Sequence, residues 1–135
     1  MPAKTTRASA PAKSGTKKPP PKPVLRFRMR VTNGEQIAVG PGKIALLEAI
    51  EKTGSITAAA KSLEMSYRRA WLLLDEMNRS LRQPAVSTSQ GGSSGGGSVL
   101  TDAGRQVIAL YRRIEEGATA ACQQDIRALM KLLAR

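Results

Sequence analysis

Four consecutive residues near the middle of the chain carry side chains suited to contacting a nucleic acid: Ser66, Tyr67, Arg68 and Arg69. An arginine guanidinium can donate two hydrogen bonds to the edge of a guanine, a contact that contributes about 1–3 kcal/mol of discrimination between bases. A tyrosine can bond a phosphate or pack against a thymine methyl group. The alternative is an ordinary helix start with solvated arginines.

Two further hydroxyls, on Ser55 and Thr57, precede this segment. We expect a helix to begin at these residues, so that their side chains and the free N–H groups of its first turn can face one anion. Such an arrangement is suited to binding a backbone phosphate.

A run of glycine and serine follows further along the chain. Small residues let the backbone approach another molecule closely. Because β-prone residues flank the run, we predict a hairpin, or wing, over residues 84–100 rather than the alternative, a flexible linker. Its tip residues are expected to contact DNA: Gly91, Gly92, Ser93, Ser94, Gly95 and Gly96.

Two capped helices joined by a tight turn are expected to position these side chains. Ser55 caps a helix over residues 56–63, and Ser66 caps a second one over residues 67–81. The apolar stripe of the second helix consists of Ala70, Trp71, Leu74, Met77 and Leu81. We therefore expect Trp71 and Leu74 in the core, without contact to DNA, and the start of that helix facing outward.

The segment before the two helices predicts a hairpin and one more helix. Residues 25–31 alternate between apolar side chains and arginine, which predicts a half-buried strand. Its apolar face is expected to consist of Leu25, Phe27, Met29 and Val31. Asn33-Gly34 predicts the turn, residues 36–39 the return strand, and residues 43–53 a helix. The arginines on the other face suit either a DNA backbone or protection of a sheet edge.

Residues 101–135 are expected to form one long C-terminal helix, in which Gly117 is a possible point of bending. Its apolar stripe is too long for a three-helix core to cover, so we predict a homodimer in which a partner helix covers the rest. The dimerisation residues are expected to be Val107, Leu110, Ile114, Ala118, Ile126 and Leu129. Two recognition helices about 34 Å apart would then read half-sites one turn apart.

The chain has 22 Lys and Arg against 10 Asp and Glu, a net charge of +12 that favours a polyanionic partner, nucleic acid first and a membrane surface second. Residues 1–23 hold six basic and no acidic residues, which predicts a disordered arm that touches phosphates or only solubilises the protein. Residues 24–135 would then be one DNA-binding domain. We see neither a membrane-spanning run nor a secretory signal, and we expect a cytoplasmic protein at the nucleoid.

Enzyme chemistry is not expected. The sequence has no histidine and one cysteine, and it lacks a phosphate-loop pattern, so we expect no cofactor and no metal site. Cys122 lies in an alanine-rich helical segment, where a small buried residue is the usual interpretation. An intermolecular or reactive thiol is the alternative.

Residues 54–78, the glycine run at 91–97 and residues 99–111 together resemble the DNA-binding domain of the ModE family of molybdate-responsive regulators. The features that carry this resemblance are Gly54-Ser55-Ile56, Ser66-Tyr67, Ala70-Trp71, Glu76-Met77-Asn78, the glycine run and Leu100-Thr101-x-x-Gly104. The two helices are also similar to those of LysR-type regulators. The resemblance implies a winged helix-turn-helix dimer that binds a palindromic operator through Ser66 to Arg69 and the wing.

We therefore expect a mainly α fold with a small β component, and a sequence-specific transcription regulator that binds double-stranded DNA. Full-length members of the family carry C-terminal molybdate-binding domains, and this sequence ends at Arg135, so we do not expect molybdate binding. Two alternatives remain open. One is a nucleoid-associated protein with little sequence preference, and the other is a sensor that holds an oxyanion such as molybdate in its dimer interface.

Overall fold

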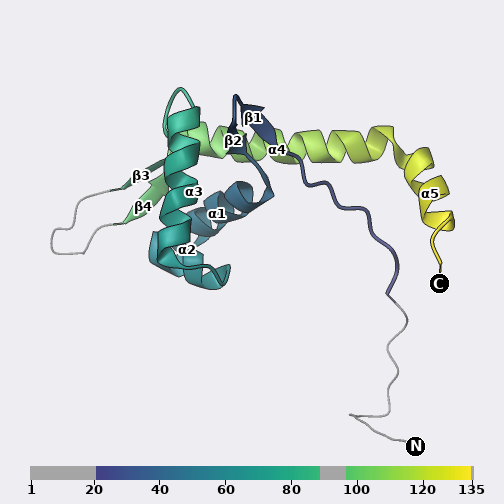
Figure 1. The fold of residues 1–135 in the computed structure, drawn as a ribbon, viewed down its shortest axis with the longest axis horizontal. Helices are drawn as coiled ribbons and strands as arrows, with labels where there is room; N and C mark the ends of the chain where they lie inside the picture. The colour runs from purple at the N-terminus through teal and green to yellow at the C-terminus, as the bar shows by residue number, and fades with distance from the viewer. Residues whose placement is uncertain (1–20, 89–96, 135) are drawn as a thin grey trace, which may run out of the picture.

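The computed structural model describes residues 21–88 and 97–134, which form a mainly helical fold with two small hairpins (Figure 1). The elements are β1 (Val31–Asn33), β2 (Gln36–Val39), α1 (Pro41–Thr53), α2 (Ile56–Ser62), α3 (Tyr67–Ser80), β3 (Val86–Thr88), β4 (Ser98–Leu100), α4 (Asp102–Ala121) and α5 (Gln123–Lys131). The predicted mainly α fold with a small β component is confirmed. No helix in these two ranges is long and apolar enough to cross a membrane.

The main core lies between α1, α2, α3 and the base of the β3–β4 hairpin. The helix predicted over residues 43–53 is present as α1, and its Ile44, Leu47 and Ile50 are all fully buried. Gly54 ends this helix in the left-handed conformation, with φ of 72°, as a glycine C-cap does. The chain can therefore turn at once into α2.

The N-terminal hairpin is shorter than predicted. Its turn lies at Gly34, which has φ of 66°, and the return strand β2 is the predicted one. The strand expected over residues 25–31 is wrong, because regular pairing begins only at Val31. β2 has four residues before Gly40-Pro41 starts α1, so residues 25–30 have no strand to pair with. Of the expected apolar face, Phe27 and Met29 are half-buried, whereas Leu25 and Val31 are exposed.

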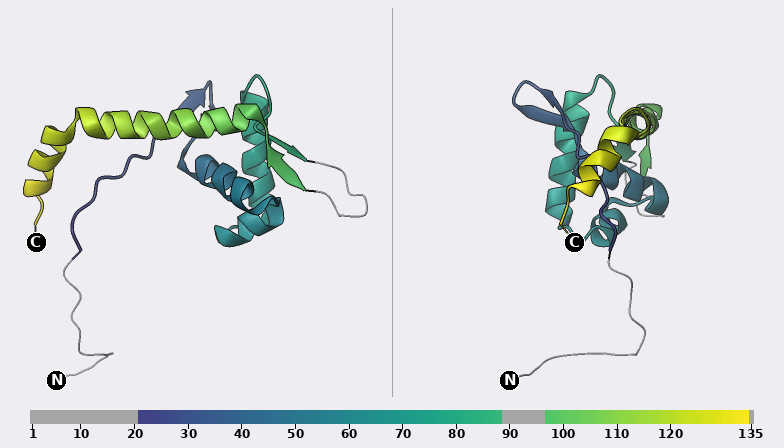
Figure 2. Two further views of the ribbon diagram at one scale, coloured as in Figure 1. Left: turned by 180° about the vertical axis from the view of Figure 1, so that it is seen from behind. Right: turned by 90° about the vertical axis from the view of Figure 1, so that its right-hand side faces the viewer.

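The predicted single C-terminal helix is divided into two. Thr101 caps α4 by accepting a hydrogen bond from the N–H of Gly104, and α4 ends at Ala121. Cys122 has φ of −107° and ψ of 19°, and α5 leaves in a new direction (Figure 2). The Thr119 hydroxyl donates to the Glu115 carbonyl one turn earlier, a contact that often bends helices. Gly117 remains within α4.

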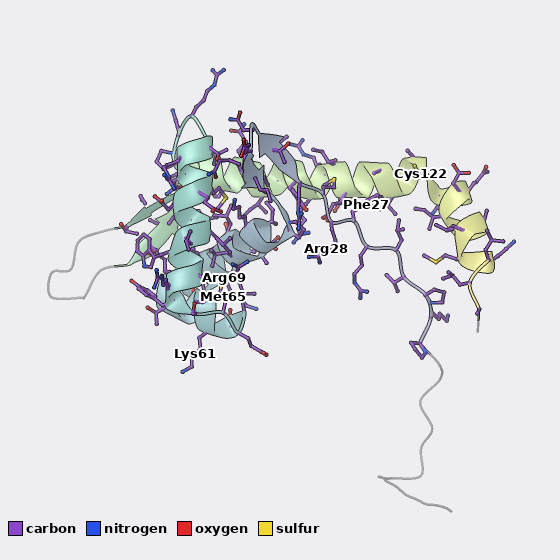
Figure 3. The ribbon with its side chains drawn as sticks, in the orientation of Figure 1. Phe27, Arg28, Lys61, Met65, Arg69 and Cys122 are labelled. Atoms are coloured by element: carbon purple, nitrogen blue, oxygen red, sulfur yellow. The ribbon has the colours of Figure 1, made fainter. Side chains whose placement is uncertain are left out.

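Cys122 is exposed in this chain, so the expectation of a small buried residue is wrong. It stands at the corner between α4 and α5, where neither helix covers it (Figure 3).

The first half of α4 lies against α1 and the segment before β1, and the second half extends away from the rest of the domain (Figure 1). The buried Tyr111 hydroxyl donates to the Met29 carbonyl at 3.0 Å, and burial raises the pKa of Tyr111, which keeps this donor protonated. Arg112 donates two hydrogen bonds to the carboxylate of Glu48 on α1, at 3.0 and 2.6 Å. These contacts fix the direction of α4 relative to α1.

Candidate nucleic-acid interface

Two serine caps and a tight turn define the helix-turn-helix. The Ser55 hydroxyl accepts a hydrogen bond from the N–H of Ala58, and the Ser66 hydroxyl accepts one from the N–H of Arg69. In the turn, Glu64 adopts a left-handed conformation with φ of 56°, which is uncommon for a residue other than glycine. Both predicted caps are thus present, and the chain between them is as short as the sequence indicated.

The start of α3 faces outward. α3 packs on the core through Ala70 and Leu74, which leaves the side chains of Tyr67, Arg68 and Arg69 exposed. Within residues 21–88 and 97–134, neither arginine forms an ion pair with a carboxylate. Their hydrogen-bond donors are therefore available to another molecule.

The β3–β4 hairpin stands beside α3, and its two strands pair in register from Val86 with Leu100 to Thr88 with Ser98. The six tip residues expected to contact DNA, from Gly91 to Gly96, lie outside the described residues. Hydrogen bonds to neighbouring elements and within the hairpin hold its base. The N–H of Ser98 donates to the Gly54 carbonyl, the Thr101 hydroxyl to the Pro84 carbonyl, and the N–H of Ala85 to the Asn78 side chain.

Asn78 is the link between α3 and this hairpin, and we expect Asn78→Ala to destabilise the domain by about 1–2 kcal/mol. The substitution leaves the N–H of the fully buried Ala85 without its acceptor at 2.8 Å. Urea unfolding followed by circular dichroism measures the change. The control is Gln83→Ala, which truncates an exposed amide nearby. Equal stabilities of the two variants would contradict a structural role for the Asn78 amide.

Trp71 is not a core residue, contrary to the sequence-based expectation, whereas Leu74 is. The Trp71 side chain is 38% exposed and packs edge-to-face on Tyr67, with ring centroids 6.1 Å apart and an interplanar angle of 78°. Trp71 is adjacent in sequence to the stripe residue Ala70, and helical spacing alone did not distinguish the edge of the stripe from its centre.

The exposed side of Trp71 borders a small cavity between α2, α3 and the base of the β3–β4 hairpin, with a volume of about 200 Å³. The predicted phosphate-binding residues Ser55 and Thr57 line it, together with Tyr67 from α3. Thr88 and Ser98 from the hairpin line it as well, and the sequence did not indicate them. Only their pairing across the hairpin brings these two hydroxyls to the helix-turn-helix.

A second cavity, of about 410 Å³, lies between the β1–β2 hairpin, the start of α1 and α3. Arg28, Arg30 and Arg69 line it, and Figure 3 shows Arg28 on the segment before β1 and Arg69 on the lower part of α3. Lys43 also lines it but is almost fully buried, where it pairs with Glu76 at 3.2 Å and donates to the Ile37 carbonyl. Lys43 thus links the β1–β2 hairpin, α1 and α3. The role of Arg28 and Arg30 in binding the DNA backbone stays a prediction.

Comparison with known proteins finds curated relatives that are similar to part of this chain. The chain is 44% identical over 88 residues to the molybdenum transport protein ModE of Azotobacter vinelandii, which covers 65% of this chain and 33% of that protein. It is 48% identical over 79 residues to the molybdenum-pterin-binding protein MopB of Rhodobacter capsulatus, covering 58% and 29%. It is 39% identical over 77 residues to the DNA-binding transcriptional dual regulator ModE of Escherichia coli, covering 57% and 29%. The resemblance to ModE is confirmed.

The chain spans about a third of the length of these curated relatives. No family model matches it. Among solved structures it is similar to the CbnR DNA-binding domain in its complex with DNA, with a TM-score of 0.50 and 24% sequence identity. That similarity covers 65% of this chain and 95% of the CbnR chain, and it shows a winged helix-turn-helix fold.

The surface of α4 and α5 carries a stripe of apolar side chains that no other described element covers. Only Gly104 and Tyr111 of α4 are buried, and no residue of α5 is. Of the six residues expected to form a dimer interface, Leu110, Ile114 and Leu129 are exposed, and Ala118 and Ile126 are half-buried. Val107 differs from these, because it packs against both core clusters of its own chain.

Proposed function

We propose that this chain is a transcription regulator that binds double-stranded DNA through the start of α3 and the β3–β4 wing. One observation carries the proposal. Arg68 and Arg69 lie at the exposed, capped start of α3 beside the wing, and neither forms an ion pair with a carboxylate of the described residues. The name of the Escherichia coli relative, a DNA-binding transcriptional dual regulator, supports it. The proposed DNA-binding domain comprises residues 24–135, and the proposed site of action is the cytoplasmic nucleoid.

We further propose that two copies bind a palindromic operator through Ser66 to Arg69, Ser55, Thr57 and the wing tip. The proposed dimer joins the exposed apolar side chains of α4 and α5, since an uncovered stripe of this kind is typical of an association surface. A two-fold dimer presents both recognition helices to successive turns of one DNA face. The operator should therefore be a palindrome with half-sites about one helical turn apart.

Selection of bound duplexes from a random library, followed by sequencing, tests this function. We expect an enriched palindrome, and we expect Arg68→Ala or Arg69→Ala to weaken the selected site by about 1–3 kcal/mol each while sparing random DNA. Arg127→Ala is the control, because it removes the same charge from the distant helix α5. If both α3 variants bind the selected site as tightly as the control, α3 is not the reading helix.

The net charge of +12 favours a second candidate, a nucleoid-associated protein with little sequence preference. Binding without an enriched motif in the same selection would support that candidate. The absence of molybdate binding by this chain also stays a prediction. Calorimetric titration with molybdate tests it, and saturable heat would favour the oxyanion sensor instead.

A further inference from the structure

The small cavity beside Trp71 has an unusual lining, which gives it a chemistry of its own. Hydroxyl groups reach it from α3, from both strands of the wing and from the start of α2, and the indole of Trp71 forms part of its wall. Among residues 21–88 and 97–134, no acidic and no basic side chain lines it. We call it the wing-base niche and define it by Ser55, Thr57, Tyr67, Trp71, Thr88 and Ser98.

The donors of the niche are not used within the described chain. The side chains of Thr57, Tyr67 and Thr88 form no hydrogen bond with residues 21–88 or 97–134. Ser55 uses its oxygen as the acceptor for the cap of α2, which leaves its hydroxyl hydrogen available. The niche therefore presents several donors without a partner in the described residues to a single small volume.

Ser98 is the strongest sign that something polar belongs there. Its side chain is only 6% exposed, and its hydroxyl has no hydrogen-bond partner among the described residues, although its backbone N–H bonds to Gly54. A buried hydroxyl without a partner costs stability, and such groups are rare in native proteins unless a ligand or water satisfies them.

The indole N–H of Trp71 is a further hydrogen-bond donor among the residues that line the niche. An indole N–H only donates, and that of Trp71 has no acceptor within the described ranges. The edge-to-face contact with Tyr67 restricts the orientation of the indole ring. This N–H is a donor that an acceptor oxygen of a ligand in the niche can use.

We propose that the wing-base niche binds the phosphodiester of one DNA nucleotide, held by neutral donors and not by a cation. This inference rests on the proposed function. The anionic oxygens of a phosphodiester only accept hydrogen bonds, and protein hydroxyls and ring N–H groups commonly bind them. The niche lies on the side of α3 that also carries the wing, next to the exposed start of the recognition helix. A backbone phosphate seated there sets the register of α3 in the groove.

Substitutions that remove one donor without changing charge test the proposal. We expect Trp71→Phe and Ser98→Ala each to raise the dissociation constant about five- to tenfold, equally for a selected operator and for random duplex. The slope of affinity against salt should not change, because no charge is lost. Arg68→Ala is the contrast, because it should weaken the operator far more than random duplex. Thermal unfolding of each variant checks that the fold is retained.

A duplex that carries one neutral methylphosphonate identifies the phosphate. Scanning the modification along the operator should reveal one position per half-site at which wild type and Trp71→Phe bind equally well. If the losses of affinity from Trp71→Phe and from the methylphosphonate add at every position, the Trp71 N–H does not bind a backbone phosphate and the assignment is overturned. Unchanged affinity of both donor variants would overturn the niche and leave the proposed function intact, provided that wild type selects a motif. Wild type that binds no duplex overturns both.

Trp71 is the single tryptophan of the chain, so its fluorescence reports on the niche directly. We expect emission to change when duplex is added, and to change less with the methylphosphonate at the identified position. Inorganic phosphate, compared with chloride at equal ionic strength, distinguishes a free anion from DNA. Saturable quenching by phosphate alone would reassign the niche to a small anion and overturn the proposal.

Discussion

Ile114→Asp is expected to convert the proposed dimer to a monomer at micromolar concentration. The Ile114 side chain is 56% exposed at the centre of the uncovered α4 stripe, between Leu110 and Ala118. In a two-fold dimer each substitution occurs twice, and an unpaired charge buried in an interface costs about 3–5 kcal/mol. The dissociation constant of the dimer should therefore rise by at least about a hundredfold. Size-exclusion chromatography with light scattering measures the mass.

Val99→Asp is the matched control for this experiment. Val99 is 62% exposed, also carries an apolar side chain, and lies on β4, outside the apolar stripe of α4 and α5. This variant should remain dimeric. A wild-type monomer, or equal behaviour of the two variants, would show that α4 does not form the interface. Loss of the dimer should also weaken a palindromic site, because the second half-site then binds independently.

Local signals in the sequence mark where α2, α3 and α4 begin and where α1 ends. Ser55, Ser66 and Thr101 each cap a helix through contacts to residues three positions later, and Gly54 ends α1 through its own φ angle. Such contacts depend only on neighbouring residues, so a single sequence displays them. The candidate residues at the start of α3 followed from the same local reasoning.

The features that the sequence did not predict depend on contacts between distant residues. The strand at residues 25–30 is absent because its partner strand is too short. The exposure of Trp71 depends on where the wing stands relative to α3. The break at Cys122 is the exception, because it follows a local contact of Thr119 with Glu115, and the apolar stripe alone did not predict that α4 ends there.

Gly104 belongs to the sequence motif Leu100-Thr101-x-x-Gly104, and the structure explains why a glycine is needed at this position. A Cβ at this position would collide with the carbonyl group of Ala85, which is backbone and cannot rotate away. That carbonyl also accepts the N–H of Thr101, so moving it disturbs the base of the wing. Forcing extra atoms into such a contact typically costs about 1–3 kcal/mol, and we place Gly104→Ala at the upper end because the obstacle is backbone.

Gly117→Ala tests this explanation with the same chemical change in the same helix. Nothing lies within 4 Å of a Cβ built on Gly117, so only the helix propensity changes, and alanine should stabilise α4 by about 1 kcal/mol. Gly104→Ala should lower the melting temperature by about 10 °C or more, whereas Gly117→Ala should raise it by several degrees. If Gly104→Ala lowers the melting temperature and Gly117→Ala raises it, the loss at Gly104 comes from the collision with the Ala85 carbonyl. Helix propensity alone would favour alanine at both positions. A gain in stability at both positions would mean that α4 and the wing base can separate without cost.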